Sequence, residues 1–359
     1  MLDWEKIKEE LTGLDEQAME AARERQLQLL KPAGSLGLLE DMSIQMAGIT
    51  GKVKNRLHKK ILFLFGADNG VYAEGIAASP QELTHTLMDF YARGIQCGIN
   101  VICQANGVEL RLVDMGIKGE FHSPNIDNHK LMWGTDNFAK GLAMPRDTVL
   151  KAMEVGFSYA RYAKENGYDI LGNGEVGMGN TTTAAACIMA CLGLQDPEQA
   201  VGRGAGLTDE AFAHKKEVIA KALEMHKPDA SDPVDILSKV GGLDLAAMTG
   251  LYIGAAYYRL PIVVDGVISV AGALLASRFS PITSQFLFGS HVSKEPGYVL
   301  AAQVLNLKPM LMLGMRLGEG SGCPVAMTVM DTAMSVMCNM NTFGEEKVDQ
   351  EYRKDIKAD

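Results

Sequence analysis

Short apolar segments that alternate with long helical ones decide the fold class of this 359-residue chain. Five segments are rich in apolar or β-branched residues, and they cover 60–65, 109–113, 169–171, 262–264 and 310–313. The stretches between them carry apolar residues at helical spacing. Strands that are separated by helices pair in parallel, and the helices cover both faces of the sheet. The sequence therefore predicts an α/β fold with a parallel, Rossmann-like sheet.

The ligand loops of such a sheet lie at the carboxyl ends of its strands. Gly66, Gly172, Asp265 and Gly314 each follow one of the apolar runs. We therefore expect the functional site to gather around these four positions.

Both ends of the chain have helical patterning. Residues 2–30 are amphipathic and highly charged, and a second helix is expected over 325–340. One face of that second helix carries methionines spaced by three or four, namely Met327, Met330, Met334, Met337 and Met340. This face predicts a packing seam against the N-terminal helices or against a second subunit. The end of the chain, from Glu345 on, is rich in Lys, Glu and Asp and predicts a solvated tail.

Glu319 is the first candidate for a catalytic residue. It follows the apolar run that ends at Leu313, and it stands among Gly314, Gly318, Gly320 and Gly322. Glycines without side chains let a ligand approach the backbone closely, so a catalytic base is expected here. The alternative is a glycine-rich turn with a solvated carboxylate.

Glu175 is bracketed by glycines in the same way. A short buried strand, 169–171, leads into Gly172, Gly174, Gly177 and Gly179, and Asn180 and Thr181 then open a helix. A glycine loop before a helix N-terminus offers free N–H groups and the positive end of the helix dipole to an anion. Simple capping of the helix by Asn180 and the threonines is the alternative.

The same glycines match the dinucleotide pattern G-x-G-x-x-G at Gly172, Gly174 and Gly177. A nicotinamide enzyme would then need a second strand that ends in an acidic residue about 20 residues further on. Here the helix leads into a turn at Asp196-Pro197, and no Gly-Lys-Ser/Thr follows the loop. These departures favour the phosphate of a mononucleotide over a dinucleotide or a Walker-type site.

Composition excludes several classes of partner. The formal net charge of −10 argues against nucleic acid. No stretch has the ~20 apolar residues that a membrane-spanning helix needs. Cys187 and Cys191 share a helix face without histidines at ligand spacing, so they predict core thiols rather than a metal site. The first residues show no apolar signal core, so we expect the six cysteines to be reduced thiols in a cytoplasm.

Several ordered blocks together resemble the nicotinate-nucleotide:dimethylbenzimidazole phosphoribosyltransferase family. The resemblance covers nearly the whole chain, and it is carried by 31–37, 66–71, 174–184, 202–207, 241–248, 264–266, 290–297 and 316–322. It implies transfer of the phosphoribosyl group of nicotinate mononucleotide to a benzimidazole-type base, with release of nicotinate and no cofactor. It further implies a homodimer, an α/β domain over 56–322, a discontinuous helical domain from 1–55 and 323–345, and a polar tail over 346–359.

The resemblance also implies roles for single residues. Glu319 matches the general base, and Glu175 matches a second acidic residue that contacts ribose or supports the reacting groups. The residues implied at the nucleotide are Gly177, Asn180, Thr181, Gly204, Lys215, Ser293 and Gly318. Lys215 lies on an expected helix, so an exposed surface lysine is the alternative there.

Ser79, His85 and Thr86 match the segment that lines the pocket of the incoming base. The family often has glutamine where this chain has Thr86, which leaves the preferred base open among benzimidazoles, purines and phenols. Two functions of other classes also remain: an NAD-dependent oxidoreductase and a catalytically silent nucleotide-binding protein. The presence of both Glu175 and Glu319 argues against the silent protein.

Overall fold

A computed structural model describes residues 2–350 of the chain. Its described residues form one sheet of seven parallel strands in the order β3-β2-β1-β4-β5-β6-β7. The strands are β1 (Lys60–Ala67), β2 (Val108–Gly116), β3 (Ile126–Asn128), β4 (Ile170–Val176), β5 (Ile262–Val264), β6 (Leu287–His291) and β7 (Pro309–Leu311). The chain reverses direction across the sheet between β1 and β4, which is where open α/β sheets bind ligands. The predicted α/β fold is confirmed.

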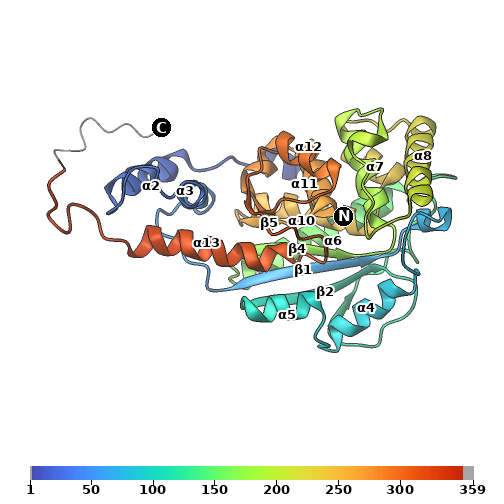
Figure 1. Ribbon diagram of the computed structural model, residues 1–359, viewed down its shortest axis with the longest axis horizontal. Helices are drawn as coiled ribbons and strands as arrows, with labels where there is room; N and C mark the ends of the chain where they lie inside the picture. Colours follow the sequence, from blue (N-terminus) through green and yellow to red (C-terminus); the bar gives the residue numbers. More distant parts are fainter. Residues whose placement is uncertain (1, 351–359) are drawn as a thin grey trace.

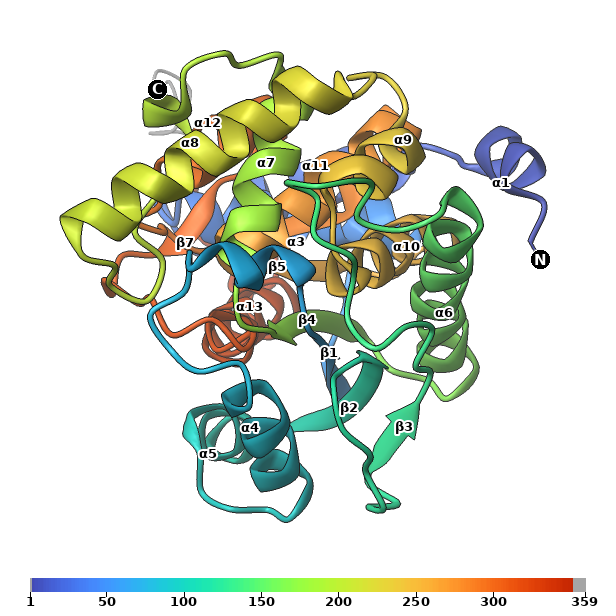
Figure 2. The same cartoon turned by 90° about the vertical axis from the view of Figure 1, so that its right-hand side faces the viewer.

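Helices cover both faces of the sheet because its central strand is apolar on both sides. In β1, Ile61, Phe63 and Phe65 enter one core, while Leu62 and Leu64 enter the other. The first core is built with α6 (Arg146–Glu165), α7 (Asn180–Leu192), α8 (Asp209–His226), α9 (Pro233–Val240), α10 (Leu243–Tyr257), α11 (Val267–Phe279) and α12 (Pro296–Val304). The second is built with α3 (Leu38–Thr50), α4 (Leu83–Ala92), α5 (Gly98–Ala105) and α13 (Gly322–Asn339). Figure 2 shows α7 and α8 on the opposite side of the sheet from α4 and α5.

Helices from both ends of the chain pack together at one end of the long axis of the molecule (Figure 1). These are α2 (Glu16–Gln28), α3 (Leu38–Thr50) and the outer part of α13. Ala18, Ala22, Ala47 and Met337 share a small core there, which places one member of the methionine face against the N-terminal helices. A division into two domains at the predicted boundaries stays a prediction, and the tail beyond residue 350 lies outside the described residues.

The structure corrects several sequence-based boundaries. The segment 2–30 contains two helices, α1 (Trp4–Glu10) and α2, because Gly13 and its neighbours interrupt the helical run. The strand expected at 169–171 continues to Val176, so Glu175 lies on a strand and the glycine loop begins only at Gly177. The last strand ends at Leu311, and Met312 and Leu313 are exposed. Strands β3 and β6 were not expected, since both are short and contain polar residues.

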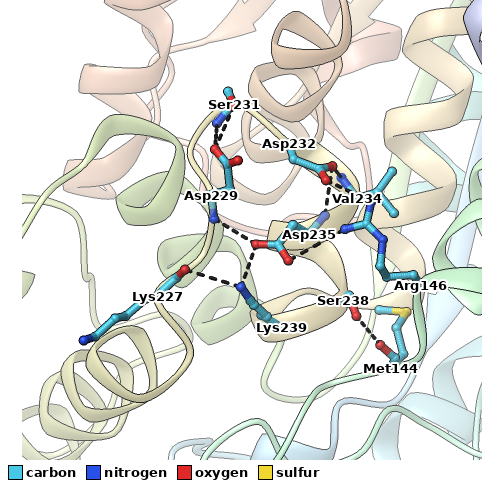
Figure 3. A network of polar contacts seen from close by, with 10 residues as sticks. All are labelled: Met144, Arg146, Lys227, Asp229, Ser231, Asp232, Val234, Asp235, Ser238 and Lys239. Atoms are coloured by element: carbon cyan, nitrogen blue, oxygen red, sulfur yellow. Dashed lines mark hydrogen bonds and ion pairs between the residues drawn. The ribbon is translucent and has the colours of Figure 1, made fainter.

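A polar network outside the sheet joins the α8–α9 connection to the start of α6 (Figure 3). Arg146 forms ion pairs with Asp232 at 2.8 Å and with Asp235 at 3.7 Å, and Lys239 pairs with Asp235 at 2.8 Å. Asp232 also caps α9 by accepting hydrogen bonds from the backbone of Val234 and Asp235. Charge and capping are both satisfied within the network, so its role is structural.

Candidate active site

A cavity of about 560 Å³ lies at the carboxyl ends of the strands. This volume suits a small organic ligand. Most of the residues that sequence reasoning selected line it, namely Ser79, Glu175, Gly177, Asn180, Thr181, Gly204, Ser293, Gly318 and Glu319. Lys215, His85 and Thr86 are not among the lining residues.

The two glycine-bracketed carboxylates meet because their backbones touch. A Cβ atom added to Gly174 would lie 2.3 Å from the carbonyl oxygen of Glu319, so only glycine permits this approach. The backbone N–H of Glu319 faces the Glu175 carboxylate and acts to lower its pKa. Glu175 also accepts a hydrogen bond from the side-chain amide of Asn180. Glu175 therefore ties the Glu319 loop to the start of α7.

Glu319 is held in an unusual backbone conformation. Its φ is +61°, in the left-handed region that residues with side chains seldom adopt. Burial raises the pKa of its carboxyl group, although the Tyr91 hydroxyl and the Ile99 amide act to lower it. Its Oε2 atom is buried and has no hydrogen-bond partner among the described residues. A strained, desolvated carboxylate at the wall of a cavity is suited to accept a proton.

Two further buried acids, Asp244 and Asp265, act on this pair, and a third, Asp68, acts on Asp244. Burial raises the pKa of Asp244 and of Asp265 to about 7, and it also raises the pKa of Asp68. Burial, Asp244 and Asp265 together raise the pKa of Glu175 well above its ordinary value. Asp265 directly follows β5 and is one of the four strand-end positions around which the sequence predicts the site, whereas Asp68 and Asp244 have no predicted role of their own.

Asp265 fixes the far end of the Glu319 loop. Its Oδ1 atom accepts a 2.7 Å hydrogen bond from the N–H of Gly322, the first residue of α13. The same oxygen lies 3.6 Å from Nδ1 of His291, whose pKa is lowered by burial. Both Asp265 and His291 also line the cavity.

The start of α7 presents its backbone to the cavity without a side-chain cap. Gly179 is the N-cap residue, with φ of +90°, and no side chain accepts a hydrogen bond at this end. Capping of the helix by Asn180, the alternative to an anion site, does not occur, because its side-chain amide binds Glu175 instead. The N–H groups of Asn180 and Thr182 donate to the carbonyls of Gly177 and Gly179. This end of α7 therefore offers an anion the positive end of the helix dipole rather than a full set of free N–H groups.

Lys215 is not a surface lysine. Its side chain is fully buried on α8, and its Nζ atom donates to Thr181 Oγ1 at 2.9 Å and to the Gly202 carbonyl at 3.0 Å. Burial lowers its pKa to about 8, although the nearby Glu295 acts to raise it. Both acceptors line the cavity, so the ammonium group lies directly behind the wall.

Glu295 binds the loop around Gly204. Its Oε1 atom accepts a 3.1 Å hydrogen bond from the Gly204 N–H, and a Cβ atom on Gly202 would lie 1.6 Å from its Oε2. The Glu295 carboxylate thus accepts the hydrogen bond of the Gly204 N–H and lies near the buried ammonium group of Lys215. This backbone donor and the ammonium group together are suited to a phosphate. Sequence reasoning assigned no role to Glu295, although it lies in the same block as Ser293.

The segment predicted to contact a base is only partly in the cavity. Ser79 and Leu87 line it, whereas His85 stacks on Phe121 with ring centroids 4.3 Å apart. The Thr86 hydroxyl donates to the Glu82 carbonyl in its own helix. The helical twist of α4 therefore turns Leu87, rather than Thr86, toward the cavity.

The described residues contain no group of three or more His, Cys, Asp or Glu side chains arranged for a metal ion. All six cysteines are free thiols, and Cys187 and Cys191 are buried. Within residues 2–350, no helix is both long and apolar enough to cross a bilayer.

Comparisons with known proteins agree over almost the full chain. A family model described as "Phosphoribosyltransferase" matches residues 11–348. The nicotinate-nucleotide–dimethylbenzimidazole phosphoribosyltransferase of Clostridium perfringens strain ATCC 13124 is 44% identical over 347 residues, which cover 97% of this chain and 96% of that protein. The protein of the same name from Clostridium tetani is 42% identical and covers 96% of this chain and 94% of its own length.

Solved structures give the same result. The crystal structure of the phosphoribosyltransferase of this name from Thermus thermophilus has a TM-score of 0.88 and 36% identity, with 94% of this chain and 100% of that chain covered. A CobT structure from the same organism has a TM-score of 0.89 and 37% identity, with 93% and 99% covered. The chain belongs to the nicotinate-nucleotide–dimethylbenzimidazole phosphoribosyltransferase family.

Proposed function

We propose that this protein transfers the 5-phosphoribosyl group of nicotinate mononucleotide to 5,6-dimethylbenzimidazole or a related lower-ligand base. The products are nicotinate and an α-ribazole 5′-phosphate-type compound, which serves the assembly of the cobamide nucleotide loop. Membership of the family supports this function. The observation that carries it is Glu319, a half-buried carboxylate at the wall of the cavity whose Oε2 atom is shielded from solvent.

The reaction is a substitution at the anomeric carbon. A ring nitrogen of the base attacks C1′ on the face opposite nicotinate, so the N–C1′ bond forms with inversion from β to α. The bond from C1′ to the pyridinium nitrogen breaks, and its electron pair neutralises the leaving ring. The second nitrogen of the attacking base then carries an acidic proton, which Glu319 accepts as the new bond forms.

The phosphate is proposed to bind where backbone donors meet a buried cation. The start of α7 supplies the positive end of a helix dipole and the Gly204 N–H supplies a donor, with Gly177, Gly318, Asn180, Thr181 and Ser293 in the surrounding wall. Lys215 supplies positive charge from behind Thr181. Glu295 must release the Gly204 N–H when a phosphate enters, because both are anionic.

The base is proposed to lie near Glu319 against Ser79 and Leu87. His85 and Thr86 flank this part of the cavity and act on the base only through the position of α4. Leu87 is an apolar contact, which favours a hydrophobic aromatic ring over a strongly polar one. We further propose that the protein acts as a homodimer in the cytoplasm and that the reaction needs no cofactor.

A substrate panel tests the function. The protein is incubated with nicotinate mononucleotide and, in turn, benzimidazoles, purines and phenols, and the products are measured by mass spectrometry. We expect release of nicotinate and a ribotide with at least one benzimidazole. Thermal protection by NAD alone, with neither binding nor turnover of nicotinate mononucleotide, would overturn the proposal in favour of the oxidoreductase.

A further inference from the structure

The Tyr91 hydroxyl and the Oε2 atom of Glu319 are both buried side-chain atoms, and Glu319 itself belongs to the cavity wall. The Tyr91 side chain on α4 is only 3% exposed, and its hydroxyl has no hydrogen-bond partner among the described residues. The Oε2 atom of Glu319 is buried and unpaired in the same way. The first turn of α5 contacts both residues, since Asn100 donates to the Tyr91 carbonyl at 3.1 Å and a Cβ atom on Gly98 would lie 3.7 Å from Oε2 of Glu319. Burial raises the pKa of Tyr91 and Glu319 raises it further, while the Tyr91 hydroxyl acts to lower the pKa of Glu319, which burial raises. Burying either group without a partner is unfavourable, so a contact between them has a clear energetic reason.

The other neighbours of the carboxylate explain why this contact matters. Cys97, Glu175 and Asp265 all face it, and each of these groups would carry a negative charge when ionised. The Ile99 N–H, in the first turn of α5, is the second group that acts to lower the pKa of Glu319. The packing is tight, because a Cβ atom on Gly98 would lie 2.7 Å from a Leu317 side-chain carbon and 3.7 Å from Oε2.

We infer that Tyr91 is a positioning residue, whose hydroxyl donates to the ionised Glu319 carboxylate and orients it toward the incoming base. Tyr91 does not line the cavity, so it acts only through Glu319. During the reaction the proton of the base moves to Glu319, and Tyr91 keeps its own proton because burial strongly disfavours its ionised form. This inference rests on the proposed function, and it adds a residue to which the sequence analysis assigned no role.

The direction of the change in the pH dependence of kcat depends on which protonation form of Glu319 the Tyr91 hydroxyl stabilises. A donor to the ionised carboxylate favours the proton-accepting state, so its removal leaves fewer Glu319 side chains ionised at low pH. Tyr91→Phe keeps the ring and removes only the hydroxyl. We expect kcat to fall about 3–10-fold near pH 6 and to stay within about twofold near pH 9, with KM for nicotinate mononucleotide unchanged.

The matched control is Tyr159→Phe, which removes another buried hydroxyl that donates to a carboxylate, Asp127, at 2.8 Å and away from this cavity. It should leave the pH profile of kcat unchanged. A loss in Tyr91→Phe that is equal at all pH values would reduce Tyr91 to a packing residue and overturn the inference.

A second measurement detects the interaction between Tyr91 and Glu319 without substrate turnover. The ¹³C carboxyl signal of Glu319, identified by its loss in Glu319→Gln, is titrated in the wild-type protein and in Tyr91→Phe. We expect its midpoint to move to higher pH in the variant, and an unmoved midpoint contradicts the inference. If the wild-type protein turns over no base in the panel while this midpoint still moves, the proposed function fails and the pairing of Tyr91 with Glu319 stands.

Discussion

At the scale of single residues, Glu319 has three features that each destabilise the folded state and that a purely structural residue would not need. Its backbone is in the left-handed region, its carboxylate is desolvated, and one of its oxygens is unpaired. Backbone strain of this kind costs about 1–3 kcal/mol and persists where function requires it. Most of the other residues with φ above zero in the described chain are glycines.

Glu319→Gln tests its role as the base. Glutamine keeps the size and much of the hydrogen bonding but cannot accept the proton, so kcat should fall by about 10²–10⁴-fold. KM for nicotinate mononucleotide should change little, because the phosphate is held elsewhere. Steady-state kinetics with a benzimidazole measure both constants. Near wild-type turnover in Glu319→Gln, together with an inactive Glu175→Gln, would move the base to Glu175.

Lys215 should make nucleotide binding depend on pH. Its pKa is lowered to about 8 by burial, so its positive charge is present below that pH and is lost above it. KM for nicotinate mononucleotide in the wild-type protein should therefore rise above pH 8. In Lys215→Met it should be raised about 10-fold at pH 7 and should no longer change around pH 8. The control is Lys216→Met. Lys216 lies on the same helix as Lys215 and pairs with Glu198, so this variant should behave as the wild-type protein does.

At the scale of elements, the loop around Gly204 is held by the segment that leads into α12. Glu295 occupies the Gly204 N–H and lies near Lys215, so it competes with any phosphate for both groups. Removing its charge should strengthen anion binding.

Glu295→Gln keeps a hydrogen-bond acceptor but relieves this competition. Inorganic phosphate should bind about 2–10-fold more tightly, because repulsion between two anions is removed. Calorimetric titration with phosphate gives the dissociation constant, and Glu198→Gln on the surface provides the control. Weaker phosphate binding in Glu295→Gln would show that the carboxylate organises the loop rather than competing for it.

The packing of α6 against α10 supports the central strands and depends on glycines. A Cβ atom on Gly156 would lie 1.8 Å from the Ala247 carbonyl oxygen, and one on Gly250 would lie 1.9 Å from the Met153 carbonyl oxygen. The two helices therefore approach to backbone contact.

Gly156→Ala should force these helices apart. We expect the free energy of unfolding to fall by about 1–3 kcal/mol or more, despite the higher helix propensity of alanine. Urea denaturation measures the change. Gly141→Ala is the control, since a Cβ atom there meets no atom within 4 Å. Equal stability of the two variants would contradict the close approach of α6 and α10.

At the scale of the whole molecule, several buried acids lie near the carboxyl edge of the sheet. Burial of their ionised forms lowers the stability of the folded protein. Asp244 and Asp265 have pKa values raised to about 7 by burial, well above their ordinary value. The folded state therefore holds protons that the unfolded chain releases at lower pH. Their stabilising contribution is present below the unfolded pKa, and it is lost as the pH rises through about 7.

The melting temperature should accordingly fall between pH 5 and pH 8, by about 5 °C or more. Asp244→Asn combined with Asp265→Asn should flatten this dependence, because asparagine does not titrate. Thermal unfolding at constant ionic strength measures it. Asp229→Asn serves as the control, since Asp229 is exposed and its pKa is lowered by Ser231. A melting temperature that rises over this range would show that the buried acids do not dominate the pH dependence.

The sequence by itself determined those features that depend on neighbours in the chain. The apolar runs at 60–65 and 262–264 became strands because a run of apolar residues must be buried on both faces of a sheet. The glycines around Glu175 and Glu319 identified both carboxylates, since a bare backbone before a helix start is a local pattern. The sequence argument against a dinucleotide site agrees with the structure in one respect, because a 3₁₀ helix, Pro197–Gln199, stands where a strand would be needed.

Only the tertiary structure decided which distant groups meet. The strand order brings β4 beside β5, so that Glu175 lies among Asp244, Asp265 and Glu319 from separate parts of the chain. Lys215 became buried because α8 packs against α7 and against the loop that contains Gly202, and nothing in its own helix signals that. The twist of α4 turned Leu87 and not Thr86 toward the cavity. Local patterns specify the elements, but the pKa values and partners of site residues depend on burial and on contacts between elements, which arise only when the chain has folded.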